Sequence, residues 1–148
     1  MNSNVFQEFI DFVEHGDKLT VVTLKGHLAI EELLSRILNS ITGHQALISD
    51  ARLSFHQKRL LVQAHSGVRS SDASWQIIQI LNTLRNEIGH KLQAERSSDL
   101  IDRIRHLLRN RDSQSYLLIP NPNDDVELIS HVVSFLIGFL GAFLRELE

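Results

Sequence analysis

Hydrophobic residues recur along most of this chain at the three- and four-residue spacing of an amphipathic α-helix. No long segment alternates between apolar and polar residues, as a half-buried strand would, and no internal repeat is found. The spacing and the capping residues beside it predict helices near residues 4–14, 18–41, 54–66, 72–93, 98–110 and 125–147. The 148 residues therefore predict one all-α domain, a bundle of five or six helices.

Residues that favour helix N-termini precede four of these predicted helices: Ser54, Ser71 or Asp72, Ser98 or Asp99, and Asp124 with Asp125. Gln57 follows Ser54 at the spacing of a capping box. Trp75 lies on the apolar face of the fourth helix and is expected in the core. The apolar run 116–119, just before the two prolines, is expected to be an extended segment on the edge of the bundle.

The last predicted helix is unusually apolar, since residues 132–144 include no charged side chain. A membrane span needs about 20 apolar residues, so this stretch falls short, and we expect a core helix and no membrane partner. Alternatively, Gly138, Gly141 and Ala142 let another helix approach closely, either from the same chain or from a second subunit.

Composition narrows the possible functions. Hydrophobic residues make up 43% of the chain and charged residues 22%, as in ordinary globular domains, and the absence of cysteine excludes disulfides, thiolate zinc sites and cysteine nucleophiles. Residues 1–14 include acidic but no basic side chains, unlike a secretory signal, so a cytoplasmic location is expected. The net charge of −3 argues against a large nucleic-acid-binding surface, so any RNA contact should be local. Neither a glycine-rich phosphate loop nor a zinc-protease motif is present, and we expect no cofactor and no metal.

Arg85, Asn86 and His90 concentrate candidate chemistry near the end of the fourth predicted helix. Arginine binds phosphate oxygens through two parallel hydrogen bonds, and histidine transfers protons near neutral pH. Arg85 and His90 are separated by about 140° around a straight helix, so they do not easily point at one atom. Either the helix distorts near Gly89, or two copies meet across a two-fold axis and share one cleft. In the plain alternative, these residues only solvate a helix end, where histidine suits the helix dipole.

The stretch from Leu84 to His90 resembles the motif of the HEPN superfamily, an arginine followed by a polar residue and then, four to six residues after the arginine, a histidine. Residues 26–34, Gly-His-Leu-Ala-Ile-Glu-Glu-Leu-Leu, also resemble the second-helix pattern of HEPN-like proteins, including those near the mannitol repressor family. The resemblance implies a metal-independent endoribonuclease of the toxin or defence type that acts as a homodimer. Arg85 would then hold the scissile phosphate, His90 would act as general acid or base, and Asn86 would orient one of them.

Other members of the superfamily keep the fold without the activity. The alternative function is therefore an inactive HEPN-like or mannitol-repressor-like module that binds a partner protein or regulates transcription. An antitoxin or a regulatory protein is a candidate partner of this chain.

Two further groups of residues are candidates for supporting roles. His27 and Glu31 lie four residues apart on one helical face, where Glu31 could pair with Arg85 or simply face solvent. Together with His90 they do not have the spacing of a recognised metal site. Arg103, Arg105 and Arg109 belong to the most basic region and are candidates for contacting an RNA backbone, the alternative being a solvated helix face.

Overall fold

The computed structural model describes residues 18–88 and 94–148, with the backbone alone for residues 94 and 95. Within these ranges it contains α-helices, one 3-10 helix and no strand: α2 (Lys18–Thr42), α3 (Gln45–Ala51), α4 (Phe55–His65), η1 (Gly67–Ser71), α5 (Ala73–Ile88), α6 (Ala94–Arg111), α7 (Ser113–Leu117) and α8 (Asp125–Leu147). The all-α class is confirmed, but the predicted count of five or six is too low, since the described residues alone form seven α-helices.

The long predicted helices are close to the observed ones. The segments 18–41, 54–66 and 125–147 correspond to α2, α4 and α8, and the helix expected over 98–110 is α6, which begins earlier, at Ala94. Neither Ser98 nor Asp99 therefore starts that helix. The predicted helix 4–14 and the end of the predicted helix 72–93 lie outside the described residues.

The short helices α3 and α7 were not predicted, because five to seven residues are too few to display a helical period. The run 116–119 is not extended, since α7 continues to Leu117. A local cap explains α7: the Asp112 carboxylate accepts hydrogen bonds from the Ser115 backbone N–H at 3.1 Å and from the Ser115 hydroxyl at 2.8 Å.

Local hydrogen bonds begin several helices as their residues predict. Ser54 and Gln57 form both halves of a capping box, with hydrogen bonds of 2.9 and 3.1 Å. At the start of α5 the capping residue is Asp72, which accepts a hydrogen bond from the Ser74 backbone N–H at 2.9 Å. At the start of α8, the Asp124 side chain accepts hydrogen bonds from the backbone N–H groups of Val126 and Glu127.

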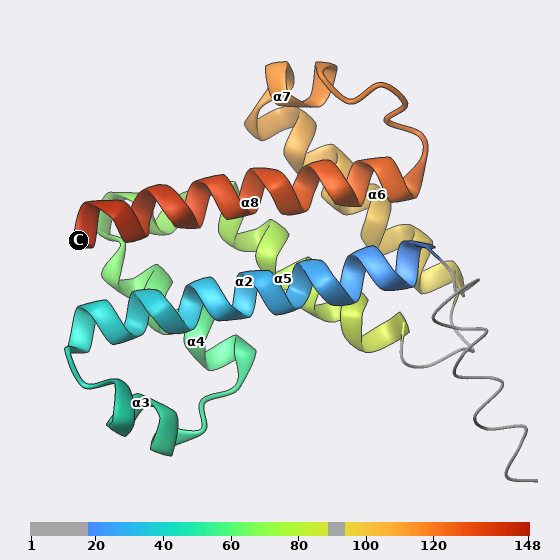
Figure 1. Ribbon diagram of the computed structural model, residues 1–148. Coiled ribbons are helices and arrows are strands. Elements are labelled where there is room, and N and C mark those ends of the chain that lie inside the picture. Colours follow the sequence, from blue (N-terminus) through green and yellow to red (C-terminus); the bar gives the residue numbers. More distant parts are fainter. Residues whose placement is uncertain (1–17, 89–93) are drawn as a thin grey trace, which may run out of the picture.

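The two longest helices, α2 and α8, lie side by side along one face of the molecule (Figure 1). They pack tightly at Gly26, where an added Cβ would lie 2.4 Å from Cγ2 of Val133. By contrast, a Cβ added at Gly138 would meet no atom within 4 Å, and one at Gly141 would meet only Arg145. Within the described chain, the glycine that permits close packing of α8 is therefore on α2, and the expected role of Gly138 is wrong for contacts within the subunit.

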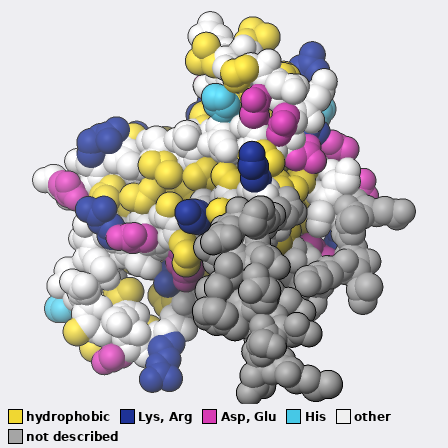
Figure 2. Space-filling view, turned by 45° about the vertical axis from the view of Figure 1, so that its right-hand side comes forward, with side chains coloured by type: hydrophobic (Ala, Val, Ile, Leu, Met, Phe, Trp, Pro, Cys, Tyr) yellow, Lys and Arg dark blue, Asp and Glu magenta, His cyan; other side chains and the backbone are white. Residues whose placement is uncertain are grey.

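The core is formed by buried apolar side chains of α2, α4, α5, α6 and α8. Trp75 is buried as predicted, and its ring meets Phe139 of α8 edge to face at 5.4 Å. Of the described helices, only α8 is long and apolar enough to cross a membrane by length and composition, a test that core helices also pass, and Leu128, Val132 and Leu136 on its inner face are fully buried. Some apolar residues remain outside the core, and Figure 2 shows hydrophobic side chains in a band across the middle of one face.

Candidate functional site

Arg85 and Asn86 lie in the last turn of α5, and both side chains are exposed. Leu81 and Leu84 on the same helix are completely buried, which fixes how this end of α5 is oriented. Nη1 of Arg85 donates a hydrogen bond to Oδ1 of Asn86 at 3.3 Å. The role expected for Asn86, orienting Arg85 or His90, stays a prediction. His90 lies outside the described residues.

The His27 side chain is buried between α2, α4 and α5, with 6% of its surface exposed. Its Nε2 lies 2.8 Å from Oδ1 of Asn82, and its ring stacks on Phe55 with 4.2 Å between ring centres. Because a carbonyl oxygen can only accept, Nε2 donates this hydrogen bond. Asn82 was missed by the sequence analysis, although a polar residue three positions before Arg85, on the inner side of α5, was the available signal.

Burial lowers the pKa of His27 below its ordinary value, because the protonated ring loses hydration inside the protein. The hydrogen bond to Asn82 and the negative charge of Glu31 oppose this shift, while the positive charge of Arg85 adds to it. The net effect favours a neutral His27 ring. Arg85 follows Asn82 by three residues on α5, so the two residues are neighbours on the helix surface.

Glu31 has a partner other than the one expected. Its Oε1 accepts a hydrogen bond from Nζ of Lys58 on α4 at 3.1 Å, whereas Arg85 bonds to Asn86. Glu31 thus connects α2 to α4. It forms no ion pair with Arg85, although the charges of both residues influence the pKa of His27. Among the residues that the structure describes, no three His, Asp or Glu side chains are grouped as metal ligands.

A groove of about 440 Å³ separates α5 from α6. Gln76, Gln79 and Thr83 line it from α5, while Arg96 and Arg103 line it from α6, together with Asp99. Arg96 also lies 3.5 Å from the carboxylate of Glu87, an ion pair between the end of α5 and the beginning of α6. Of the three arginines that the sequence singles out as RNA-binding candidates, Arg103 is the one that lines this groove.

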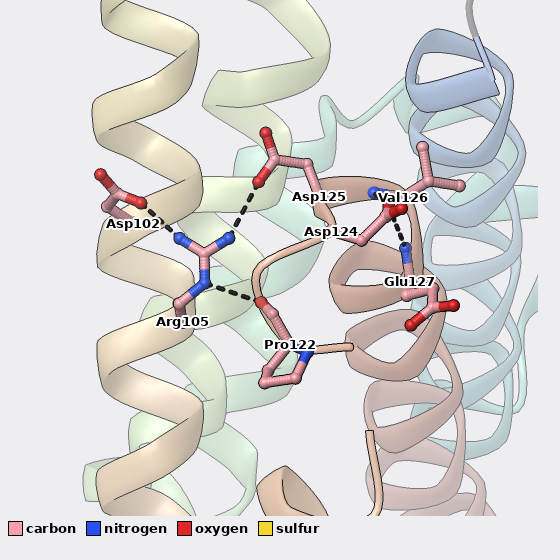
Figure 3. A network of polar contacts seen from close by, with 7 residues as sticks. All are labelled: Asp102, Arg105, Pro122, Asp124, Asp125, Val126 and Glu127. Carbon is pink, nitrogen blue, oxygen red and sulfur yellow. Dashed lines mark hydrogen bonds and ion pairs between the residues drawn. The ribbon is translucent and has the colours of Figure 1, made fainter. Parts of the chain in front are cut away.

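Arg105 and Arg109 are engaged in contacts within the fold. Figure 3 shows the guanidinium of Arg105 between Asp102, Asp125 and the backbone oxygen of Pro122. The bonds to Pro122 and Asp125 measure 3.0 and 2.8 Å, and they tie α6 to the connection that leads into α8. The guanidinium of Arg109 lies 5.7 Å from the centre of the Tyr116 ring, in cation–π geometry. Both residues therefore have structural roles.

Comparisons with protein-family models, with curated proteins and with solved structures find no significant match to this chain.

Proposed function

We propose that this protein is a metal-independent endoribonuclease that acts as a homodimer, with Arg85 and His90 as its catalytic residues. The observation that carries the proposal is the placement of Arg85, which is exposed on a buried and well-anchored helix end and is hydrogen-bonded to Asn86. An arginine held in this way can present two parallel N–H groups to a phosphate, as a transition state with developing negative charge requires.

The reaction uses a nucleophile that belongs to RNA. A general base removes the proton of the ribose 2′-hydroxyl, and the 2′-oxygen attacks the adjacent phosphorus. The bond to the 5′-oxygen breaks, a general acid protonates that oxygen, and a 2′,3′-cyclic phosphate remains. His90 serves as the general acid or base, because an ordinary histidine pKa of about 6.5 allows both protonation states near neutral pH. Arg85 neutralises the phosphate, and Asn86 orients Arg85. No cofactor takes part.

His27 has a positioning role in this proposal. It is buried and favours its neutral form, so it is unsuited to proton exchange with a substrate on the surface. Its hydrogen bond to Asn82 instead joins α2 to α5 close to Arg85. Glu31 of α2 forms an ion pair with Lys58 of α4, which ties α2 to α4 as well.

The spacing of Arg85 and His90 in the sequence supports the proposed homodimer. Arg85 and His90 are about 140° apart on a regular helix, so a second copy is the simplest source of a histidine facing each arginine. The α5–α6 groove also lies away from Arg85, since Gln76 and Arg85 are separated by about half a turn around the helix axis.

The groove provides the local RNA contacts that a protein of net charge −3 needs. Arg103 can bind a backbone phosphate, and the amides of Gln76 and Gln79 can form hydrogen bonds to ribose or bases. Arg96 lines the same groove but is already paired with Glu87. Arg105 and Arg109 are left out of this surface because their guanidinium groups already have partners.

Purified protein is incubated with mixed RNA in the presence of a chelator, and the products are analysed for 2′,3′-cyclic phosphate ends. His90→Ala should lose ~10²–10⁴-fold in rate, as expected for a lost general acid or base. Arg85→Lys should fail as well, because lysine keeps the charge but loses the paired N–H groups. Arg36→Ala, which removes an exposed arginine from α2, is the matched control and should cleave normally. DNA lacks the 2′-hydroxyl and should remain intact.

Sedimentation equilibrium of the same preparation should show a species of twice the 16.9 kDa chain mass. A purely monomeric protein at tens of micromolar, or a His90→Ala variant that cleaves as fast as the wild type, would contradict the proposal. If the wild type cleaves no RNA, the silent module that binds a regulatory partner becomes the better function.

A further inference from the structure

A second cavity, of about 270 Å³, lies near the C-terminal end of α2, where α2, α3 and the beginning of α4 meet. Its polar lining consists of Ser35 and Asn39 from α2, Gln45 and Ser49 from α3, Arg52 from the following turn, and Lys58 from α4. Pockets for drug-sized ligands usually measure about 300–1,000 Å³, so this one is suited to a smaller molecule. It is separate from the groove between α5 and α6.

The charged side chains that line this cavity are both cationic. Lys58 donates one hydrogen bond to Glu31 at 3.1 Å, and its ammonium group has two further N–H donors. Arg52 forms no ion pair with any residue that the structure describes, and it is exposed as well as part of the cavity lining. The cavity therefore offers free cationic donors beside neutral hydroxyl and amide groups.

Arg52 occupies a backbone conformation that arginine rarely adopts. It ends α3 with φ 51° and ψ 47°, in the left-handed region, where glycine or asparagine is the usual residue. The other two positive-φ positions in the described chain are both glycines, Gly43 and Gly67. An arginine at such a position costs stability that glycine would not, and strain of this kind is often retained for function. Because Arg52 also lines the cavity, a binding role there would explain why an arginine occupies this position.

We propose that this cavity binds the phosphate group of a small phosphomonoester, with a sugar phosphate as the best-fitting class. Arg52 binds the phosphate through two parallel N–H groups, and Lys58 adds its free donors. The neutral side chains of Ser35, Asn39, Gln45 and Ser49 are suited to hydrogen bonds with sugar hydroxyls. The proposal does not depend on RNA cleavage at Arg85.

Calorimetric titration of the full chain with ribose 5-phosphate, inorganic phosphate and ribose tests the ligand class. Ribose 5-phosphate should bind more tightly than inorganic phosphate, and ribose should not bind. A 5′-phosphorylated oligoribonucleotide and its 5′-hydroxyl counterpart form the second arm, because a strand end carries the same group. Binding of the phosphorylated strand without binding of ribose 5-phosphate would overturn the small-molecule assignment, as would no binding of any probe at millimolar concentration.

Arg52→Gly separates this binding role from a structural one, because the two predict opposite changes. Glycine adopts the left-handed conformation freely, so the variant should fold and melt at a higher temperature than the wild type. Its affinity for ribose 5-phosphate should nevertheless fall at least tenfold. Glu31→Gln should tighten binding, because it frees Lys58 from its carboxylate partner. Arg36→Ala removes an equal charge from α2, and it should alter neither the melting temperature nor the affinity for ribose 5-phosphate. Unchanged affinity in Arg52→Gly would overturn the proposal.

Discussion

The close contact between α2 and α8 makes Gly26→Ala an informative perturbation. An alanine Cβ at this position would lie 2.4 Å from Cγ2 of Val133 and 3.2 Å from its Cγ1. Val133 cannot easily move aside, because its β-branched side chain has few rotamers in a helix and is buried against α2. The clash must therefore be relieved by moving α2 and α8 apart, and these two helices share the most extensive helix–helix contact among the described residues.

The size of the effect is a balance of two opposing contributions. Overpacking a well-packed core costs about 1–3 kcal/mol, and a contact this short at a stiff side chain favours the upper part of that range. Replacing glycine with alanine inside a helix returns about 1 kcal/mol through helix propensity. We expect a net loss of about 1–2 kcal/mol in the free energy of unfolding. For a chain of this size, that loss corresponds to a decrease of roughly 2–8 °C in Tm.

Gly138→Ala is the matched control, since it makes the same change on α8 where a new Cβ meets nothing within 4 Å. It should stabilise the protein by about 1 kcal/mol through helix propensity alone. Urea denaturation followed by circular dichroism gives both values. The double variant Gly26→Ala with Val133→Ala should be more stable than the sum of the single effects by at least about 1 kcal/mol, because the clashing methyl groups are gone. If Gly26→Ala stabilises the protein as much as Gly138→Ala does, the account of this contact is wrong.

Two further variants test contacts described above. Because burial lowers the pKa of His27 in the folded state, the unfolded chain binds more protons once the pH falls below the ordinary value of about 6.5. This contribution to stability is therefore intact above about pH 6.5 and is lost progressively as the pH falls toward the folded-state pKa of His27. The free energy of unfolding of a His27→Gln variant should fall less between pH 7 and 5 than that of the wild type. An equal dependence of the two free energies on pH would contradict the shift. Arg105→Leu should destabilise the protein by about 1–3 kcal/mol, because Arg105 is only 18% exposed and bonds to both Pro122 and Asp125. Hydrogen exchange should then accelerate in the connection before α8, and an unchanged Tm would rule out this tie.

Much of the fold could be predicted from the sequence, because helix positions depend on local information. Apolar spacing over several turns located α2, α4, α6 and α8, and the hydrogen bonds of the Ser54 capping box span only three residues. The exceptions have the same cause. Helices α3 and α7 are too short to display a helical period in the sequence. Helix α3 ends at Arg52, which has a left-handed backbone conformation, and α7 begins at the cap formed by Asp112.

The candidate site divides in the same way. Arg85 and Asn86 were identified from the sequence because their chemistry and spacing are visible in a short motif, and the bond between adjacent side chains is local. The partners of His27 and Glu31 were not identified. Asn82 is 55 residues from His27, and Lys58 is 27 residues from Glu31, so these contacts exist only once α2, α4 and α5 have packed together.

The sequence by itself determined the helical class and the approximate extent of the long helices, and it suggested which residues to test for action on a phosphate. These features are encoded within a few turns of chain. The tertiary structure decided how each helix is rotated about its axis and which helix it meets. It placed Gly26 rather than Gly138 at the close contact and left Leu28, on an apolar pattern of α2, 64% exposed. It also paired Arg105 with Asp125, whereas Arg52 has no ion-pair partner among the described residues, because long-range packing determines which charged groups meet.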